Sequence, residues 1–425
     1  MSNLHKYLSA ILISGIGVGR IFANGFGILN QDAFATARGQ AFVATADNPS
    51  AIYYNPAGIA QLEGDNLRGG IGGYYLNSTF TSPVNTGNPF NPGGVTYHSA
   101  AYHYAAVPSG FYTHTFKDSP LTVGLGVYSP YGGNIDWPAD TSFNTIAIEG
   151  RLLYLTINPT AALKLNPHLF IGAGIMANYV NLYTDQAIIQ LQNPPNFFKF
   201  KGDGWSVGYN LGALYQPARW ISFGGTFRSS AMVNLKGHSN FQEPPAIQPT
   251  TLPAQMSLTF PLTVVLGVSL RPTPKWNVEF DANYTEWESF GTTTIYQNGT
   301  PPIGVDQDIT LNLDWRGSWI YEVGVTRYFG NAWHVSAGYA FDQNSVPSQY
   351  YSPFAADMDR HFFSLGLGFQ GKTIDFDVTY QFGYGPGYTV YNSLPSSTVS
   401  TSNQTADGKY TFQSSALLVS AGIHF

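Results

Sequence analysis

The feature that most constrains this chain is a long series of strand-like segments, which runs from residue 67 to the C-terminus. In the segment 373–382, TIDFDVTYQF, apolar residues alternate one by one with polar residues. Period-two alternation gives a strand one apolar face and one polar face. Segments 277–284 and 319–326 repeat the pattern, and about fourteen such segments can be recognised, an even number as in bacterial barrels.

The links between these segments alternate strictly between short and long, and both ends of the series lie on the short side. Tight turns at one end and long loops at the other are typical of a β-barrel that spans the bacterial outer membrane. The sequence therefore predicts an all-β fold, a transmembrane antiparallel β-barrel of about 14 strands over residues 67–425. The short links are 117–120, 166–167, 216–218, 271–274, 329–331 and 370–372, and the long ones are 81–103, 130–150, 184–203, 229–261, 288–317, 342–359 and 384–413.

Composition favours the same class and excludes several others. Charged residues make up 10% of the chain, against roughly 25% in an ordinary soluble domain. Cysteine is absent, which excludes a disulfide framework and a thiolate metal site. The net charge of -6 argues against a nucleic-acid partner, which would select a basic chain. No GxSxG, HExxH or phosphate-loop motif occurs, so we expect neither an enzyme nor a bound metal or cofactor.

The first 23 residues have the features of a secretory signal peptide. A short basic region with His5 and Lys6 precedes an apolar stretch from Tyr7 to Val18, and Ala23 offers a small residue for cleavage. The apolar stretch is shorter than the roughly 20 residues that a membrane-spanning helix needs. Export with no further spanning helix predicts a location in the bacterial outer membrane.

Residues 24–66 stand between the signal and the first strand and are too apolar for a loose tail. A barrel of about fourteen strands encloses a lumen wider than its own side chains fill, so we expect this segment to fold into the lumen as a plug, or hatch. Within it, Asn55 and Pro56 predict a helix start, with Asn as N-cap and Pro at the first helical position.

Several motifs resemble those of the FadL/TodX family of outer-membrane transporters (OmpP1/FadL/TodX), which carry long-chain fatty acids and other hydrophobic compounds. They are Arg38-Gly39, Ala41-Phe42, Ala46-Asp47-Asn48-Pro49-Ser50, Asn55-Pro56-Ala57-Gly58 and, downstream, 124–132, GLGVYSPYG. The last of these resembles the kinked third strand of the family. Glycine in a strand marks a bend and Pro130 cannot donate to the ladder, although 129–133 could equally begin the next loop.

The resemblance implies passive uptake of a hydrophobic ligand. Outer loops would capture it in an apolar groove, the hatch N-terminus would contact it inside the lumen, and it would leave sideways beside the kinked third strand. The expected partners are the ligand, outer-membrane lipid and lipopolysaccharide, and the assembly machinery that reads the terminal Phe425; the protein is expected to be a monomer. The site residues expected on this basis are Gly25, Phe26, Asn55, Pro56 and Ala57 in the hatch, Pro130, Tyr131 and Gly132 at the kink, and Phe197, Phe198, Lys199, Phe200, Met232 and Phe241 in the capture groove.

Two questions, the ligand and the function, stay open in the sequence. The ligand could be a fatty acid, an aromatic hydrocarbon or an alkane. A general diffusion porin and a structural or adhesive barrel are rival functions, although an apolar plug argues against an open porin. The inward carboxylates are expected to pair with arginines near the strand ends: Glu279, Asp281, Glu322, Asp375 and Asp377 with Arg151, Arg316, Arg327 or Arg360.

Overall fold

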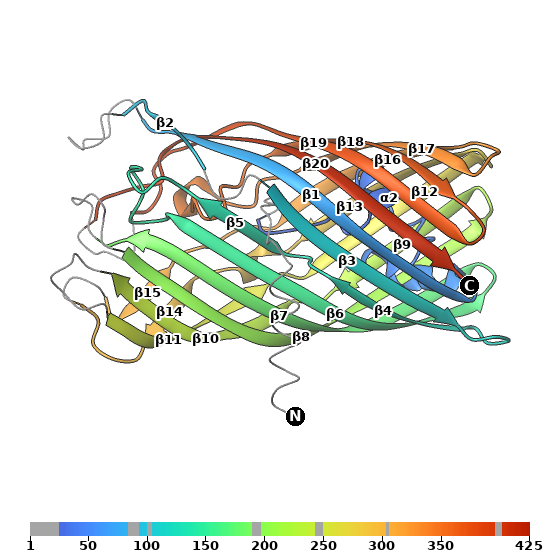
Figure 1. Ribbon diagram of the computed structural model, residues 1–425, viewed down its shortest axis with the longest axis horizontal. Helices are drawn as coiled ribbons and strands as arrows, with labels where there is room; N and C mark the ends of the chain where they lie inside the picture. Colours follow the sequence, from blue (N-terminus) through green and yellow to red (C-terminus); the bar gives the residue numbers. More distant parts are fainter. Residues whose placement is uncertain are drawn as a thin grey trace.

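The computed structural model describes residues 25–83, 93–99, 104–188, 197–242, 250–302, 306–395 and 402–425. Within these ranges the strands form one closed antiparallel barrel of 14 strands, as predicted (Figure 1). The first strand closes the barrel by pairing with the last, from Asn66 opposite His424 to Thr81 opposite Lys409. None of the described helices is long and apolar enough to cross a membrane.

Six of the fourteen wall positions are occupied by two consecutive strand segments, because the strand is interrupted there. These interruptions occur between β2 and β3, β4 and β5, β9 and β10, β11 and β12, β13 and β14, and β15 and β16. The segments are β1 (Asp65–Thr81), β2 (Thr96–His98), β3 (Tyr104–Thr115), β4 (Leu121–Tyr128), β5 (Gly132–Asp136), β6 (Glu149–Asn166), β7 (Leu169–Ala187), β8 (Phe197–Ala218), β9 (Ile221–Arg228), β10 (Ala231–Gln242), β11 (Thr250–Phe260), β12 (Thr263–Thr273), β13 (Trp276–Thr285), β14 (Thr293–Gln297), β15 (Asp308–Leu311), β16 (Ser318–Tyr328), β17 (Trp333–Asp342), β18 (Arg360–Gln370), β19 (Ile374–Val390) and β20 (Gly408–His424).

The alternation of short turns and long loops is confirmed, and the C-terminus lies at the short-turn end (Figure 1). The prediction of a long loop over 229–261 is wrong, because most of it forms the hairpin of β10 and β11. The reason is an inverted pattern. In this hairpin the apolar side chains, such as Val233 and Leu235, point inward, while Asn234 and Lys236 point outward. An inverted amphipathic strand lacks the outer apolar face by which the other strands were recognised.

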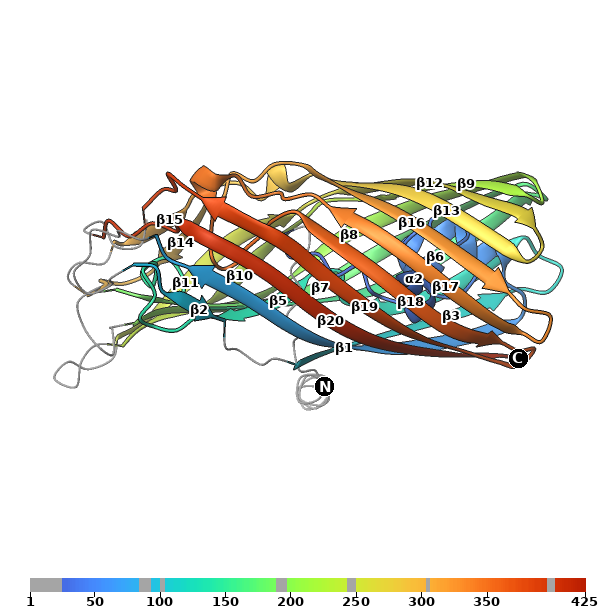
Figure 2. The same cartoon turned by 90° about the horizontal axis from the view of Figure 1, so that it is seen from above.

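Residues 25–64, which we call the hatch, fill the lumen at the short-turn end. They carry helix α2 (Ala33–Ala37), helix α3 (Ala51–Tyr54) and the 3-10 helix η1 (Pro56–Gln61). Both side views place α2 inside the barrel (Figures 1 and 2). Two further 3-10 helices among the described residues belong to the long loops, η2 (Trp287–Ser289) and η3 (Ser348–Tyr350).

Glycines on the inner wall let the hatch backbone approach the strands closely. A Cβ atom at Gly338 of β17 would lie 2.0 Å from the backbone nitrogen of Gly39, and one at Gly224 of β9 would lie 2.1 Å from the carbonyl oxygen of Val43. Neither distance is sterically possible. The wall is therefore shaped to receive the hatch at several points around its circumference.

Candidate functional site

An apolar cavity of about 630 Å³ lies in the barrel on the long-loop side of the hatch, and we call it the inner cavity. Most of its lining residues are aliphatic or aromatic. The lining residues are Phe26, Gly133, Gly150, Arg151, Leu152, Leu182, Thr184, Met256, Leu258, Phe260, Phe290, Thr293, Leu311, Leu313, Trp315, Ser352, Phe354 and Ala355.

Residues 25–31 of the hatch, which we call the arm, run along this cavity. The ring of Phe26 lies 5.5 Å from that of Trp315 and 5.7 Å from that of Phe290. Gly25 has a φ of 65°, and a Cβ there would come within 2.7 Å of the Trp315 ring. Only glycine fits this position. Of the hatch residues expected to meet a ligand, Phe26 is therefore the one that lines the cavity.

The arm pairs with an interruption in the third strand. This strand ends as β4 at Tyr128 and resumes as β5 at Gly132, and both parts pair with β6. Gly27 and Tyr131 form an antiparallel bridge. On either side of it, the amide of Ile28 donates to the carbonyl of Pro130 at 2.8 Å, and that of Gly132 donates to the carbonyl of Phe26 at 2.9 Å. The three residues expected at the kink thus hold the arm.

Within the described part of the chain, the wall beside this interruption is not closed by ladder hydrogen bonds. β3 pairs with β4 only from Gly110 to Thr115, and among the described residues β5 pairs with β6 alone. The seam rejoins farther up, where the hydroxyl of Ser99 donates to the carbonyl of Asp136 at 3.0 Å. We call the unpaired stretch between β3 and β5 the third-strand gap.

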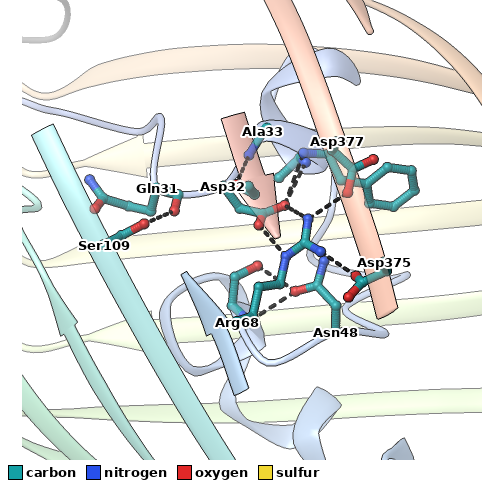
Figure 3. Close-up of polar contacts among 12 residues, drawn as sticks. Gln31, Asp32, Ala33, Asn48, Arg68, Ser109, Asp375 and Asp377 are labelled. Atoms are coloured by element: carbon teal, nitrogen blue, oxygen red, sulfur yellow. Dashed lines mark hydrogen bonds and ion pairs between the residues drawn. The ribbon is translucent and has the colours of Figure 1, made fainter. Parts of the chain in front are cut away.

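Gln31 bridges the lower rim of this gap, a role that the sequence did not reveal. Its side-chain amide donates to the carbonyl of Ser129 at 2.8 Å, and its side-chain carbonyl accepts the amide of Ser129 at 3.3 Å. Its backbone carbonyl accepts the hydroxyl of Ser109 on β3 at 2.7 Å (Figure 3). Gln31 therefore takes the place of a β3 residue opposite the end of β4. No motif marks it, because these contacts are entirely long-range.

Tyr54 of α3 connects the arm to the rest of the hatch. Its hydroxyl donates to the carbonyl of Leu29 at 2.9 Å and accepts the amide of Gln31 at 3.2 Å. Burial raises the pKa of the Tyr54 phenol well above its ordinary value, and the Asp32 carboxylate raises it further. The hydroxyl therefore stays protonated and remains a donor at neutral pH.

The remainder of the hatch, residues 32–64, which we call the body, is held by carboxylates of the wall. Asp281 accepts the amides of Phe42 and Val43 at 2.8 and 2.9 Å. Glu279, two positions along the same strand, accepts those of Ala44 and Thr45 at 2.7 and 3.2 Å. Four successive backbone donors are thus satisfied by two adjacent inward side chains of β13.

Two buried arginines complete this attachment. Arg38 of the hatch pairs with Glu279 at 2.9 Å, and both side chains have no exposed surface. Arg68 of β1 pairs with Asp32, the N-cap of α2, at 2.5 Å, with Asp377 at 2.7 Å, and with Asp375 (Figure 3). Each charge is buried with partners, as a stable site requires.

The partners expected for the inward carboxylates were therefore wrong. Glu279, Asp375 and Asp377 pair with Arg38 and Arg68, which lie on the hatch and at the start of β1. Sequence position along the barrel could not reveal this, because a plug crosses the lumen. Arg151 pairs with Glu149 at 2.7 Å, Arg360 lies 3.8 Å from Asp357, and Arg327 stacks on Trp276 at 4.8 Å; the backbone amide of Arg316 donates to Ser345.

The Asn55-Pro56-Ala57 motif lies in the body, far along the chain from the arm. Asn55 caps η1 by accepting the amide of Ala57 at 3.1 Å, and Pro56 follows at the first position, as predicted. The Asn55 amide also donates to the carbonyls of Val43 and of Ala213 on β8, at 2.8 and 3.0 Å. The motif joins the body to itself and to the wall.

The residues expected in a capture groove are divided between two faces. Phe198, Phe200 and Phe241 point inward and are buried, with the rings of Phe198 and Phe241 5.4 Å apart. Met232 points outward and is 61% exposed, because it has the opposite phase on β10. Lys199 pairs with Asp185 at 3.3 Å and lies over the ring of Phe197. No cavity described above is lined by these six side chains.

Comparison with known proteins agrees with this architecture. Residues 16–425 match the family model described as outer membrane protein transport protein (OMPP1/FadL/TodX). A long-chain fatty acid transport protein of Escherichia coli O6:H1 is 23% identical over 417 residues, which cover 88% of this chain and 86% of that protein.

Solved structures share the fold. That of a Pseudomonas aeruginosa FadL homologue has a TM-score of 0.80 at 20% identity and covers 94% of this chain and 100% of its own. That of the Pseudomonas putida toluene transporter TodX has a TM-score of 0.69 at 14% identity, covering 96% and 100%. Because the family match extends over nearly the whole sequence and the barrel and its short and long turns agree with it, the chain belongs to the OmpP1/FadL/TodX family and is an outer-membrane transporter of hydrophobic compounds.

Proposed function

We propose that this protein takes up long-chain fatty acids passively, by holding the acyl chain in the inner cavity and releasing it sideways through the third-strand gap. The observation that carries the proposal is the position of the arm. The same few residues border the apolar cavity through Phe26 and bridge the gap through Gly27 and Gln31. A displacement of the arm would therefore connect the cavity to the outer side of the wall.

The physical chemistry of the lumen supports a sideways exit. Burial of an acyl chain gains about 0.8 kcal/mol per methylene group, which the inner cavity can supply. Below the cavity, the chain would meet the buried ion pairs Arg38–Glu279 and Arg68–Asp32. Passage of the ligand through that layer would separate these buried charges from their partners, which is energetically costly. The sideways route through the third-strand gap avoids this cost and leads to the membrane.

An aromatic hydrocarbon is the second candidate ligand, and one observation favours it. Arg151 is the single charged residue among those lining the inner cavity, and its guanidinium already pairs with Glu149. A ligand without a carboxylate needs no cationic partner, so it could bind while Arg151 stays paired with Glu149. The toluene transporters among the structural neighbours share the fold at 16% and 15% sequence identity, and this likeness does not distinguish the two ligands.

A reversible crosslink between the arm and the kink tests the proposal. Gly27 and Tyr131 are a pair of residues without mutual hydrogen bonds, and the Cα atoms of such pairs lie about 4.5 Å apart, a distance compatible with a disulfide. The chain has no cysteine of its own. We expect the variant Gly27→Cys/Tyr131→Cys to take up labelled oleate when reduced and to lose uptake when oxidised, in cells without their own fatty-acid transporter.

The two single variants, Gly27→Cys and Tyr131→Cys, are the controls, since neither can form the crosslink. Equal uptake by the oxidised and reduced double variant would contradict the arm mechanism. Uptake of toluene but not oleate by the reduced protein would move the ligand to the aromatic class. A large ion conductance that is the same in the oxidised and the reduced double variant would support a porin.

A further inference from the structure

Four of the short turns carry one outward or terminal cation each and no acidic residue. The cations are Arg219 between β8 and β9, Lys275 between β12 and β13, Arg327 at the end of β16, and Lys372 between β18 and β19. We call these four residues the basic rim. The segments that contain them, 216–221, 271–276, 327–333 and 370–374, have no Asp or Glu, although the whole chain has a net charge of -6.

The basic rim is one continuous edge of the barrel. The carbonyl of Trp220 accepts the amide of Arg271 at 2.7 Å, which joins the first turn to the second. The carbonyl of Lys275 accepts the amide of Tyr328 at 2.8 Å, which joins the second to the third. From there β16 to β19 follow one another in the wall. The turns lie at the end of the barrel that carries the C-terminus (Figure 1).

The rim lies at the level of an aromatic girdle. Trp220 and Trp276 are 58% and 41% exposed at the first positions after their turns. The guanidinium of Arg327 lies 4.8 Å from the ring centre of Trp276. Tryptophan on the outer wall of a membrane barrel marks the boundary between hydrocarbon and headgroups. The cations of the rim are therefore placed at headgroup level.

The other cations at this end that were considered for the rim face the lumen. Lys164 lies over the ring of Phe170, which is buried inside the barrel. The guanidinium of Arg271 donates to the hydroxyl of Ser222 at 3.2 Å, and this serine is buried as well. Neither side chain is directed at the membrane, so neither belongs to the rim.

The acidic residues of the short-turn end lie elsewhere. Asp65 begins β1, where its carboxylate is 2.8 Å from the imidazole of His114, and Glu63 and Asp118 lie in the neighbouring connections. The inward carboxylates of β13 and β19 are bound to Arg38 and Arg68, as described above. In the part of the chain that the structure describes, no rim cation forms an ion pair with a carboxylate. The rim is thus open to an anion from outside the protein.

We propose that the basic rim binds the phosphate of acidic glycerophospholipids in the leaflet at the short-turn end, which is the periplasmic leaflet of the outer membrane. Guanidinium and ammonium groups form strong hydrogen bonds with phosphate oxygens. The acyl chains of such a lipid can pack on the outward rings beyond the girdle, among them Phe223 and Phe280, which are 46% and 45% exposed. The inference is independent of the transported ligand, because it concerns the outer surface of the wall.

Competition between two lipids with the same acyl chains tests the rim. Purified full-length protein in detergent is mixed with equal amounts of dioleoyl phosphatidylglycerol and dioleoyl phosphatidylcholine, and native mass spectrometry gives the ratio of the two bound lipids. We expect the unaltered protein to prefer phosphatidylglycerol. Because a cation near an anionic surface contributes about fivefold to affinity, Lys275→Gln/Arg327→Gln should lower this preference by about tenfold. Heat-modifiable gel mobility shows whether the variant barrel is folded.

Two further variants control for net charge and for packing. Lys117→Gln/Lys164→Gln removes two cations from the same end, one beside Asp118 and one facing the lumen, and should keep the preference. Lys275→Arg/Arg327→Lys keeps both charges of the rim while it changes both side chains. It should retain the preference within about twofold, since a phosphate accepts from either group.

Each remaining outcome argues against the proposal. Equal binding of the two lipids by the unaltered protein would show that the rim does not select an acidic headgroup. An equal fall in Lys117→Gln/Lys164→Gln and in Lys275→Gln/Arg327→Gln would mean that the charge of the whole end, and not the rim, attracts the lipid. If the rim variant loses binding of added lipopolysaccharide but not of phosphatidylglycerol, the phosphate belongs to the lipid of the other leaflet and the assignment is wrong.

Discussion

The inner wall of the barrel is more polar in its short-turn half than in its long-loop half, and β8 passes through both halves. In its short-turn half, β8 turns Tyr209, Leu211 and Tyr215 outward and Asn210 inward. In its long-loop half, Phe198 and Phe200 point inward and Lys201 points outward. The alternation of inward and outward side chains continues along the whole strand. The large apolar side chains named here, however, point outward in the short-turn half and inward in the long-loop half.

This difference indicates which parts of the hatch can move. The body lies in the polar half, where buried ion pairs and four amide–carboxylate bonds attach it to the wall. The arm lies at the apolar half, where a few neutral hydrogen bonds and ring contacts hold it. Neutral hydrogen bonds contribute less than those of charged groups, so the arm is the weaker of the two attachments.

The largest effect on the attachment of the hatch is expected when a charge is removed from the polar half. Glu279→Ala leaves the guanidinium of Arg38 buried without its carboxylate and two amides of the body without an acceptor. Breaking one partner of a buried pair costs about 3–5 kcal/mol. We expect fast hydrogen exchange throughout residues 32–62 and a large ion conductance in planar bilayers, because the body no longer fills the lumen.

Glu288→Ala is the control, since Glu288 is exposed and stands in a long loop. It should have the exchange and the conductance of the unaltered protein. If Glu279→Ala also keeps them, the carboxylates of β13 do not anchor the body.

How far the sequence predicts the fold depends on this same polarity. The strands with an apolar outer face, such as β13 and β19, were predicted because the bilayer imposes the pattern on every one of them. The hairpin of β10 and β11 was missed, because at the long-loop end the apolar interior of the barrel imposes the opposite pattern. Knowing that the interior of a barrel can be apolar there would have made Val233 and Leu235 recognisable as strand residues.

The candidate site was less accessible to sequence reasoning than the fold. Local geometry predicted the Asn55 cap and suggested a break near Pro130, since both depend on neighbouring residues. Arg38 and Gln31 act through partners that lie 241 and 98 residues away along the chain. No period or motif encodes such a partner, so these contacts needed the three-dimensional arrangement.

A smaller effect is expected when polarity is introduced into the apolar half. Leu258 lines the inner cavity and is 6% exposed. Leu258→Asn would place an amide there without a partner, and burying such a group costs about 1–3 kcal/mol. We therefore expect the affinity for a fluorescent fatty acid to fall by about tenfold. Thr259→Asn, one residue along and facing outward, should bind as before; equal losses in both would mean that the ligand does not occupy this cavity.

The smallest effect should come from the arm, and it separates the arm from the body. Gln31→Ala removes the side-chain bonds to Ser129 and keeps the bond between the Gln31 backbone carbonyl and Ser109 of β3. A loss of about 1–2 kcal/mol should speed exchange of the amides in 27–31 by about tenfold and leave residues 32–62 unchanged.

Gln61→Ala is the matched control, because this glutamine donates to the carbonyls of Thr45 and Ala46 inside the body. Faster uptake of oleate by Gln31→Ala but not by Gln61→Ala would show that opening of the arm limits transport. If exchange quickens over the whole hatch in Gln31→Ala, then arm and body move as one unit, and the polarity of the lumen does not divide them.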